Sequence, residues 1–264
     1  MEKVVLTIGG SDSWAGGGVA TDIKTLEQNG VFGVIALTCM AVAGTTADFI
    51  IRSLDSQLLE EQLITIADSY ELSAIKIGLL STQESVEVVS RFLETQSCPV
   101  VLDPVLAFKE TDTRYDKEYT QAIKSLCKKA TIITPNLEEA SMLSGVKPHS
   151  VEDVKELAFK LCQALDVSVV IKGGTRLETQ DAIDVLYDGL EWYILKAEKL
   201  DKQTVNGAGC SFASAIAANL ACGLSLYEAV SRAKKFVHHS IERGFILKDG
   251  TGNVWYQRGT YDEK

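Results

Sequence analysis

The fold class follows from one stretch of the sequence, SAIKIGLLSTQESVEVVSRFLETQSCPVVLDPVLAF (73–108). Residues 73–80 and 99–108 are largely apolar runs without regular alternation, which is typical of strands buried on both faces. Residues 82–96 form a helical pattern that begins at a capping hydroxyl, Thr82, followed by an acidic first turn. A buried strand, a helix and a second buried strand predict a parallel sheet covered by helices on both faces.

The same alternation of apolar strands and helices continues through most of the chain. The apolar runs predict strands at 4–10, 31–40, 73–80, 99–108, 130–136 and 167–174. The patterns between them predict helices at 18–29, 56–71, 82–96, 115–128, 137–144 and 150–165. Beyond residue 174 the sequence predicts a hairpin that turns at Asp188–Gly189, followed by two helices near 207–222 and 225–243. No linker or repeat interrupts the pattern, so residues 1–264 are expected to form one α/β domain.

The composition disfavours several classes of partner and location. The 264 residues carry a net charge of −10, which argues against nucleic acid or an anionic membrane as a partner. No apolar run approaches the ~20 residues that cross a bilayer, and the opening MEKVVLTIGG (1–10) is typical of a first strand rather than a signal peptide. Six cysteines without a C-x-x-C pair indicate free thiols in a reducing cytoplasm, and three histidines make a histidine-rich metal site unexpected.

Ligands of parallel sheets gather where the strands end, and the first such point is the glycine-rich loop GGSDSWAGGG (9–18). The loop contains neither G-x-x-x-x-G-K-[ST] nor G-x-G-x-x-G, so it lacks both nucleotide-binding motifs. Two interpretations stay open. The glycines allow a tight turn from strand to helix, or the loop binds substrate through hydrogen bonds from Asp12 and Ser13.

A second pair of glycines, in NGAGC (206–210), opens the helix predicted near 207–222. Gly207 and Gly209 let the backbone approach a ligand, and a helix start presents unpaired N–H groups and the positive end of its dipole. We therefore expect an anion site here. The alternative, small residues that allow close helix packing, explains the alanines further along the helix better than it explains these glycines.

Two acidic residues follow neighbouring apolar strands. Asp103 ends one strand, where a carboxylate gains nothing from packing, and Glu139 lies in the first turn after TPN (134–136). Together they are suited to hold Mg²⁺ through oxygen or water, and a phosphate site needs such a cation. Each acid taken alone is more often a helix cap, and this alternative stays open.

Seven motifs carry a family resemblance, namely GSDSWAGGGVATDIKT, KIGLL, VVLDPV, TPNLEEA, VIKGG, DVLYDG and NGAGCSFASAIAA. In their order and spacing they resemble the ribokinase-like superfamily, in the branch that holds hydroxymethylpyrimidine (phosphate) kinases and pyridoxal/pyridoxine kinases. The resemblance covers nearly the whole chain. It implies a three-layer fold with a mostly parallel central sheet and helices on both faces. It also implies ATP- and Mg²⁺-dependent phosphorylation of a small molecule by a homodimer.

The resemblance gives the second glycine pair a role in phosphoryl transfer. The groups that would hold the transferring phosphate are Gly207, Ala208, Gly209 and the backbone N–H of Cys210. Cys210 stands where most of the superfamily has an aspartate. A thiol at a helix start is expected to have a lowered pKa, so that its thiolate would serve as base for a hydroxymethyl group. The alternative for Cys210 is a small buried hydrophobic residue.

The resemblance also implies a metal and nucleotide site. Asn136 and Glu139 match the N-x-x-E motif that organises Mg²⁺ and phosphates, and Asp103 matches the aspartate of D-P-V. The segment that would run under the nucleotide is Lys172, Gly173 and Gly174, with Thr175 nearby. Asp188 is expected to make the hairpin turn rather than to bind a ligand.

The identity of the substrate alcohol rests mainly on Met40. Pyrimidine kinases of this branch carry a polar glutamine or glutamate there, whereas methionine cannot make those hydrogen bonds and suits a pyridine ring. Phe108 stands where some pyridoxal kinases carry a second cysteine, and Asn206 stands where histidine is common. We expect a kinase for the 5-hydroxymethyl group of pyridoxal, pyridoxine or pyridoxamine. The alternatives are the pyrimidine kinase of thiamine synthesis and a non-catalytic protein that binds a vitamer or a nucleotide.

Overall fold

The centre of the molecule is one β-sheet. The structure is a computed structural model that describes residues 2–43, 49–106 and 117–256. Over these residues the sheet contains β1 (Val4–Asp12), β2 (Phe32–Ala43), β3 (Phe49–Ser53), β4 (Ala74–Ile77), β5 (Val100–Leu102), β6 (Ile132–Ile133), β7 (Ser168–Gly174), β8 (Asp181–Tyr187) and β9 (Trp192–Glu198). Their order across the sheet is β3-β2-β1-β4-β5-β6-β7-β8-β9.

The middle of the sheet is parallel, which confirms the sequence prediction. Strands β2, β1, β4, β5, β6 and β7 run in one direction. At the two edges, β3 pairs antiparallel with β2, and β8 and β9 form the expected antiparallel hairpin. Asp188 makes the hairpin turn as predicted, because its carboxylate accepts hydrogen bonds from the N–H groups of Leu190 and Glu191, both at 2.8 Å.

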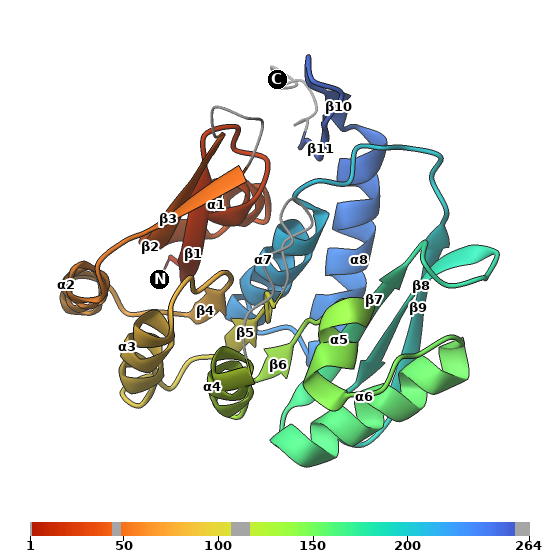
Figure 1. The fold of residues 1–264 in the computed structure, drawn as a ribbon, viewed down its shortest axis with the longest axis horizontal. Helices are drawn as coiled ribbons and strands as arrows, with labels where there is room; N and C mark the ends of the chain where they lie inside the picture. Colours follow the sequence, from red (N-terminus) through yellow and green to blue (C-terminus); the bar gives the residue numbers. More distant parts are fainter. Residues whose placement is uncertain (1, 44–48, 107–116, 257–264) are drawn as a thin grey trace.

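Helices cover both faces of the sheet (Figure 1). In the described part of the chain they are α1 (Gly18–Gln28), α2 (Ser56–Ser69), α3 (Gln83–Leu93), α4 (Lys117–Cys127), α5 (Leu137–Ser144), α6 (Val151–Leu165), α7 (Ala208–Ala221) and α8 (Leu226–Glu242). Helices α2 to α6 pack on one face, while α1, α7 and α8 pack on the other. The three predicted layers are therefore confirmed, and no helix among these is long and apolar enough to cross a membrane.

Local sequence signals explain where several helices begin. At the start of α3 the Thr82 hydroxyl accepts a hydrogen bond from the Ser85 N–H at 3.1 Å. At the start of α6, Ser150 and Asp153 form a reciprocal capping box. Helix α7 differs, since it is rich in alanine and nearly all its residues are buried. Small side chains let it pack closely against β1, β4 and β5, which brings its first turn to the edge of the sheet.

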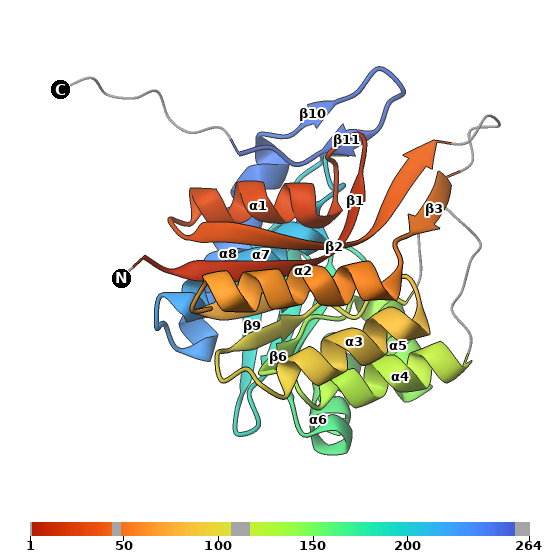
Figure 2. The same ribbon diagram turned by 90° about the vertical axis from the view of Figure 1, so that its left-hand side faces the viewer.

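The structure departs from the predicted elements in two ways. Strand β3 and a small antiparallel pair, β10 (Phe245–Ile246) and β11 (Gly252–Asn253), were not predicted. Strands β5 and β6 are shorter than the apolar runs 99–108 and 130–136. The difference arises because an apolar run indicates burial rather than strand pairing. Residues beyond the last paired position of β5, such as Leu106, are fully buried without belonging to the strand. Figure 2 shows the β10–β11 pair above α1, near the end of β1.

Candidate active site

The carboxyl ends of β5, β6 and β7 bring an acid and a lysine to the start of α7. Lys172 Nζ lies 2.7 Å from Asp103 Oδ1, and the Lys172 N–H donates to the Pro135 carbonyl at 2.9 Å. A Cβ atom built on Gly209 would lie 3.4 Å from Lys172 Nζ and 3.9 Å from Asp103 Oδ2. The segment 206–210, which we call the anion loop, therefore faces this ion pair directly.

Asp103 and Lys172 form an ion pair that is only partly closed to solvent. The Lys172 side chain retains 17% of its exposure and that of Asp103 retains 6%, and the Thr134 hydroxyl donates to Asp103 Oδ1 at 2.9 Å. Burial lowers the pKa of Lys172, but the charges of Asp103 and Glu139 raise it, and the net shift is upward. Lys172 is therefore held as a cation beside the anion loop, where a phosphate would place its negative charge.

Glu139 caps a helix, which is one of the two alternatives that the sequence left open, and its role at a metal site stays a prediction. It is the third residue of α5, and its carboxylate accepts a hydrogen bond from the Asn136 N–H at 2.7 Å in a capping box. Glu139 is also buried next to the ion pair. Burial raises its pKa to about 7, while Lys172 lowers the pKa and Asp103 raises it by a smaller effect. The same carboxyl group therefore caps the helix and lies beside the ion pair.

The arrangement of acids fits a cation that is bound jointly with phosphate. Burial is the main cause of the raised pKa of Glu139, Asp103 adds a smaller rise, and a cation bound beside the two acids would favour their charged forms. Among the residues described here, no cluster of three or more histidine, cysteine, aspartate or glutamate side chains could hold a metal alone. Mg²⁺ is commonly bound by one or two carboxylates together with substrate phosphates and water, which is the set available here.

The anion loop is held in a backbone conformation that requires glycine. Gly207 is the N-cap of α7 with φ of +85°, and a Cβ atom there would lie 2.3 Å from the Gly16 carbonyl oxygen. Within the described residues no side chain caps this helix start. The N–H groups of Ala208, Gly209 and Cys210 therefore belong to a helix start of the type that binds anions, although Ala208 also donates to the Val205 carbonyl at 3.1 Å.

The expected lowering of the Cys210 pKa is wrong in this structure. Burial raises the pKa of the thiol to about 11; Lys76 and the Gly18 N–H lower it, while Asp22 and Asp103 raise it further. Removal from water and two nearby carboxylates outweigh the groups that favour the thiolate. Without a ligand, Cys210 therefore carries its proton at neutral pH.

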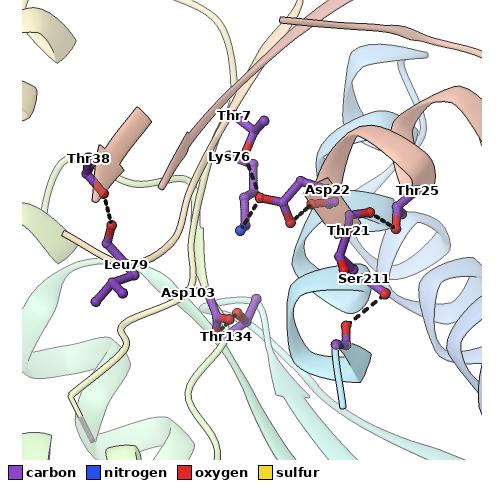
Figure 3. A network of polar contacts seen from close by, with 12 residues as sticks. Thr7, Thr21, Asp22, Thr25, Thr38, Lys76, Leu79, Asp103, Thr134 and Ser211 are labelled. Atoms are coloured by element: carbon purple, nitrogen blue, oxygen red, sulfur yellow. Dashed lines mark hydrogen bonds and ion pairs between the residues drawn. The ribbon is translucent and has the colours of Figure 1, made fainter. Parts of the chain in front are cut away.

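A fully buried ion pair beneath the anion loop was not predicted. Lys76 Nζ lies 2.7 Å from Asp22 Oδ2, with side-chain exposures of 1% and 0% (Figure 3). The hydroxyls of Thr7 and Ser214 donate to the same carboxylate at 2.6 and 2.8 Å. A lysine within the apolar run 73–80 was the available signal, because a buried ammonium group needs a partner.

The residues expected to bind substrate lie near the carboxyl ends of β1 and β2, at the same edge of the sheet. Asp12 accepts hydrogen bonds from the N–H groups of Gly16 and Gly17, at 3.1 and 2.9 Å, so it stabilises its own loop. Ser13 is exposed, and Met40 is half-buried on β2 one register position from Asp12's partner. Asp12 thus stabilises the turn from β1 to α1, and its role in substrate binding stays a prediction. Phe108 lies outside the described residues.

The segment expected to lie under the nucleotide is held by a third ion pair. Gly174 donates its N–H to Asp184 Oδ1 at 3.1 Å, and Asp184 Oδ2 lies 2.6 Å from Lys234 Nζ on α8. Thr175 is exposed just beyond it, and Gly173 is buried within β7. Asn136 forms a parallel bridge with Lys172, which places the N-x-x-E helix start beside this segment.

Comparison with known proteins agrees with this geometry. The family model described as phosphomethylpyrimidine kinase matches residues 12–255. The chain is 37% identical to a pyridoxine kinase of Bacillus subtilis over 252 residues, which cover 94% of this chain and 93% of that protein. It is 35% identical over 249 residues to a hydroxymethylpyrimidine/phosphomethylpyrimidine kinase of Aquifex aeolicus, which cover 94% of this chain and 97% of that protein.

Solved structures extend the comparison to three dimensions. The pyridoxal kinase from Staphylococcus aureus in complex with AMP-PCP and pyridoxal superimposes with a TM-score of 0.89 at 37% identity. The superposition covers 96% of this chain and 93% of that structure. Both the family model and the full-length similarity lead to one conclusion. The chain belongs to the phosphomethylpyrimidine kinase family, a family of enzymes with the ribokinase-like fold.

Proposed function

We propose that this protein transfers the γ-phosphoryl group of ATP to the 5-hydroxymethyl group of pyridoxal, pyridoxine or pyridoxamine. The observation that carries the proposal is the meeting of Lys172 and Asp103 with the anion loop at Gly209. A cation, an acid and a set of helix-start N–H groups are the parts that phosphoryl transfer needs. The relatives with AMP-PCP and pyridoxal bound support ATP and a B6 vitamer as the two substrates.

Each part has a distinct task in the proposed reaction. The anion loop, with Gly207, Ala208, Gly209 and the N–H of Cys210, binds the transferring phosphoryl group, and Lys172 neutralises its charge. Asp103 and Glu139 would hold Mg²⁺, which supplies charge neutralisation on the phosphates. The nucleotide would lie along Asn136 and the Lys172–Thr175 segment. The substrate ring would lie against Asp12, Ser13 and Met40.

Cys210 lies in the first turn of α7 and would face the reacting groups. Its pKa of about 11 makes it a hydrogen-bond donor in the ligand-free protein rather than a ready base. Only a thiolate can accept the alcohol proton, so a role as base would require Cys210 first to lose its own proton to solvent as the substrates and Mg²⁺ bind. Its backbone N–H contributes to the anion loop in either protonation state.

The pyrimidine kinase reaction is the second candidate. The family model and the Aquifex aeolicus relative support it, because both name a pyrimidine kinase. Met40 argues for the pyridine substrates, since a thioether cannot accept or donate the hydrogen bonds that an aminopyrimidine edge offers. The similarity to a pyridoxine kinase and to a putative pyridoxine kinase also supports the pyridine substrates.

One assay separates the candidates. ADP release is measured with pyridoxal, pyridoxine, hydroxymethylpyrimidine and its phosphate, side by side, in the presence and absence of Mg²⁺. We expect Mg²⁺-dependent release with the two B6 vitamers. Release only with the pyrimidines would establish the second candidate, and tight vitamer binding without ADP release would establish a non-catalytic binding protein.

Met40 provides a mutational test of the substrate assignment. Met40→Gln buries an amide without a partner against the pyridine ring. The value of kcat/KM for pyridoxal should therefore fall by an amount that corresponds to a loss of roughly 1–3 kcal/mol in transition-state stabilisation. Relative use of hydroxymethylpyrimidine should rise. An unchanged ratio of the two specificities would show that Met40 belongs to the core and that the substrate ring binds elsewhere.

We also propose a homodimer in the cytoplasm, with no nucleic-acid or membrane partner. The free cysteines of the described chain and the net charge of −10 support this environment and these exclusions. Light scattering after size-exclusion chromatography should give a mass near twice the 28.7 kDa of the chain. A monomer mass at micromolar concentration would refute the dimer.

A further inference from the structure

The anion loop is attached to a segment far away in the sequence, Phe245–Tyr256, which we call the clamp. The Asn206 N–H donates to the Gly252 carbonyl, and the Asn206 carbonyl accepts from the Val254 N–H, both at 3.0 Å. The Asn206 side chain donates from Nδ2 to Asn253 Oδ1 at 2.9 Å. The backbone and the side chain of the residue that opens the anion loop are therefore both fixed by the clamp.

The glycine-rich loop after β1 completes this contact on its other side. A Cβ atom built on Gly16 would lie 2.5 Å from Asn206 Nδ2 and 2.9 Å from Asn253 Oδ1. A Cβ atom on Gly207 would lie 2.3 Å from the Gly16 carbonyl oxygen and 3.1 Å from Val254 Cγ2. The two loops and the clamp are thus packed with no space for a side chain at either glycine.

The clamp reaches the anion loop a second time through Tyr256. Its hydroxyl is hydrogen-bonded to the Ser211 hydroxyl, and it accepts a hydrogen bond from Thr25 Oγ1 at 3.1 Å. Ser211 directly follows Cys210, and its hydroxyl also donates to the Gly207 carbonyl at 2.8 Å. The Tyr256 ring stacks on Phe236 of α8 with ring centroids 5.1 Å apart and planes 15° apart.

The Tyr256 hydroxyl is suited to a fixed hydrogen-bonding role. Burial raises its pKa to about 12, while the hydrogen bonds with Ser211 and Thr25 oppose the rise. The phenol therefore stays neutral at any physiological pH, and it links α1, α7 and α8 without introducing a charge beside the site. The clamp thus contacts the anion loop at both of its ends, at Asn206 and immediately after Cys210.

We propose that Asn253 and Tyr256 are positioning residues for phosphoryl transfer, because they hold the two ends of the anion loop in the geometry that binds the transferring phosphate. This inference rests on the kinase function proposed above. A loop with two glycines has little stiffness of its own, and Gly207 occupies a conformation that few other residues adopt. Donors that stabilise a transition state work only when they are fixed before the reaction. The clamp supplies that rigidity from outside the loop.

The proposal also gives Asn206 a physical role. The residue departs from the histidine that is common in the family, and its amide is paired with the amide of Asn253. An amide pair of this kind fixes both side chains with one hydrogen bond and introduces no charge beside a phosphate site. The two asparagines therefore act as one unit, and each should lose its effect when the other is removed.

The test compares Asn253→Ala, Tyr256→Phe and the double variant with wild type. Each single change should lower kcat by roughly 10–100-fold, since small displacements of fixed catalytic groups have effects of that size. KM for pyridoxal should stay within about threefold. Affinity for ADP with aluminium fluoride and pyridoxal, which imitates the transferring phosphoryl group, should fall in parallel with kcat, while affinity for ADP alone changes little. Asn206→Ala combined with Asn253→Ala should be no worse than either single change.

The matched control is Asp249→Ala at the tip of the clamp. Asp249 accepts a hydrogen bond from the Thr251 N–H and makes no described contact with the anion loop, so kcat should be unchanged. Loss of kcat that merely follows a lowered unfolding temperature, and disappears in assays at lower temperature, would show that the clamp only stabilises the fold. Unchanged kcat in both single variants would also overturn the proposal. A wild-type protein that releases no ADP with any of the four alcohols would instead refute the kinase function, and the inference with it.

Discussion

Two lysine–aspartate pairs in this molecule have the same length and different roles. Lys76–Asp22 and Lys172–Asp103 are both 2.7 Å apart. The first is sealed, with exposures of 1% and 0%, and its carboxylate is bonded to hydroxyls from β1 and α7. The second keeps 17% exposure on the lysine and faces Gly209 of the anion loop.

The difference between the pairs follows from their place along the strands. Lys76 lies inside β4, and its side chain reaches its partner Asp22 on the neighbouring helix α1. Asp103 comes directly after the last residue of β5, at the edge where ligands of parallel sheets bind. A lysine–aspartate pair therefore links helix and strand when it lies in the middle of the sheet. A pair of the same two residue types remains accessible to a ligand when it lies at the carboxyl edge.

The largest effect on turnover is expected at the partly exposed Lys172–Asp103 pair and at Glu139 beside it. Asp103→Asn and Glu139→Gln remove charge from the cation site, so each should lower turnover by roughly 10²–10⁴-fold, a loss of several kcal/mol in transition-state stabilisation. Vitamer binding, followed by calorimetry, should survive in both. Near-normal turnover at saturating Mg²⁺ would reduce these acids to a strand-end residue and a helix cap, and the contrast between the two pairs would vanish.

Changes in the fully buried Lys76–Asp22 pair should lower the stability of the fold more than they lower turnover. Lys76→Met leaves the Asp22 carboxylate buried and unpaired, which should lower the free energy of unfolding in urea by about 3–5 kcal/mol. The double variant Asp22→Leu with Lys76→Met should regain most of that loss, because no buried charge remains. Turnover per folded molecule should fall far less than in Asp103→Asn. A Lys76→Met protein as stable as wild type would contradict this account.

Cys210 reports on both pairs at once, because Lys76 lowers its pKa while Asp22 and Asp103 raise it. With a pKa of about 11 against an ordinary value of 9.0, the thiolate fraction at pH 8 is about 100-fold below that of an ordinary thiol. Alkylation of Cys210 by iodoacetamide, measured by peptide mass spectrometry, should therefore be slow at pH 8 and accelerate up to about pH 11. In Asp103→Asn the profile should shift to lower pH. Rapid alkylation of the ligand-free wild type at pH 7 would contradict the raised pKa and support a thiolate at position 210.

The smallest effect is expected at a solvent-exposed pair. Arg91 and Glu60 are 3.3 Å apart with exposures of 57% and 50%. Arg91→Gln should change the free energy of unfolding by less than about 1 kcal/mol and leave turnover unaltered. Thermal unfolding and the ADP assay check both expectations. A larger loss would mean that burial is not what separates the behaviour of the ion pairs.

The parts of the site that sequence could predict are those with local signals. Helix α5 begins and ends where the capping motif and Gly145 place it, and the carboxyl edge gathers Asp103 and Lys172 because parallel strands end together. Lys76 pairs with Asp22, which is 54 positions away in the sequence, and the hydrophobic periodicity of the sequence does not indicate such a pairing. The sign of the Cys210 shift was wrong for a related reason. A helix start is visible in sequence, whereas burial and neighbouring carboxylates appear only in the folded molecule.

The clamp has a consequence for how the protein is made. Its bond from Thr25 to Tyr256 joins residues 231 positions apart, and contacts of such separation are slow to form. A ribosome completes every strand from β1 to β9 and both α7 and α8 before it synthesises the clamp. A nascent chain can thus assemble its sheet and expose an anion loop whose ends are still unattached. The attachment of the anion loop at both ends therefore cannot form until Tyr256 has been synthesised.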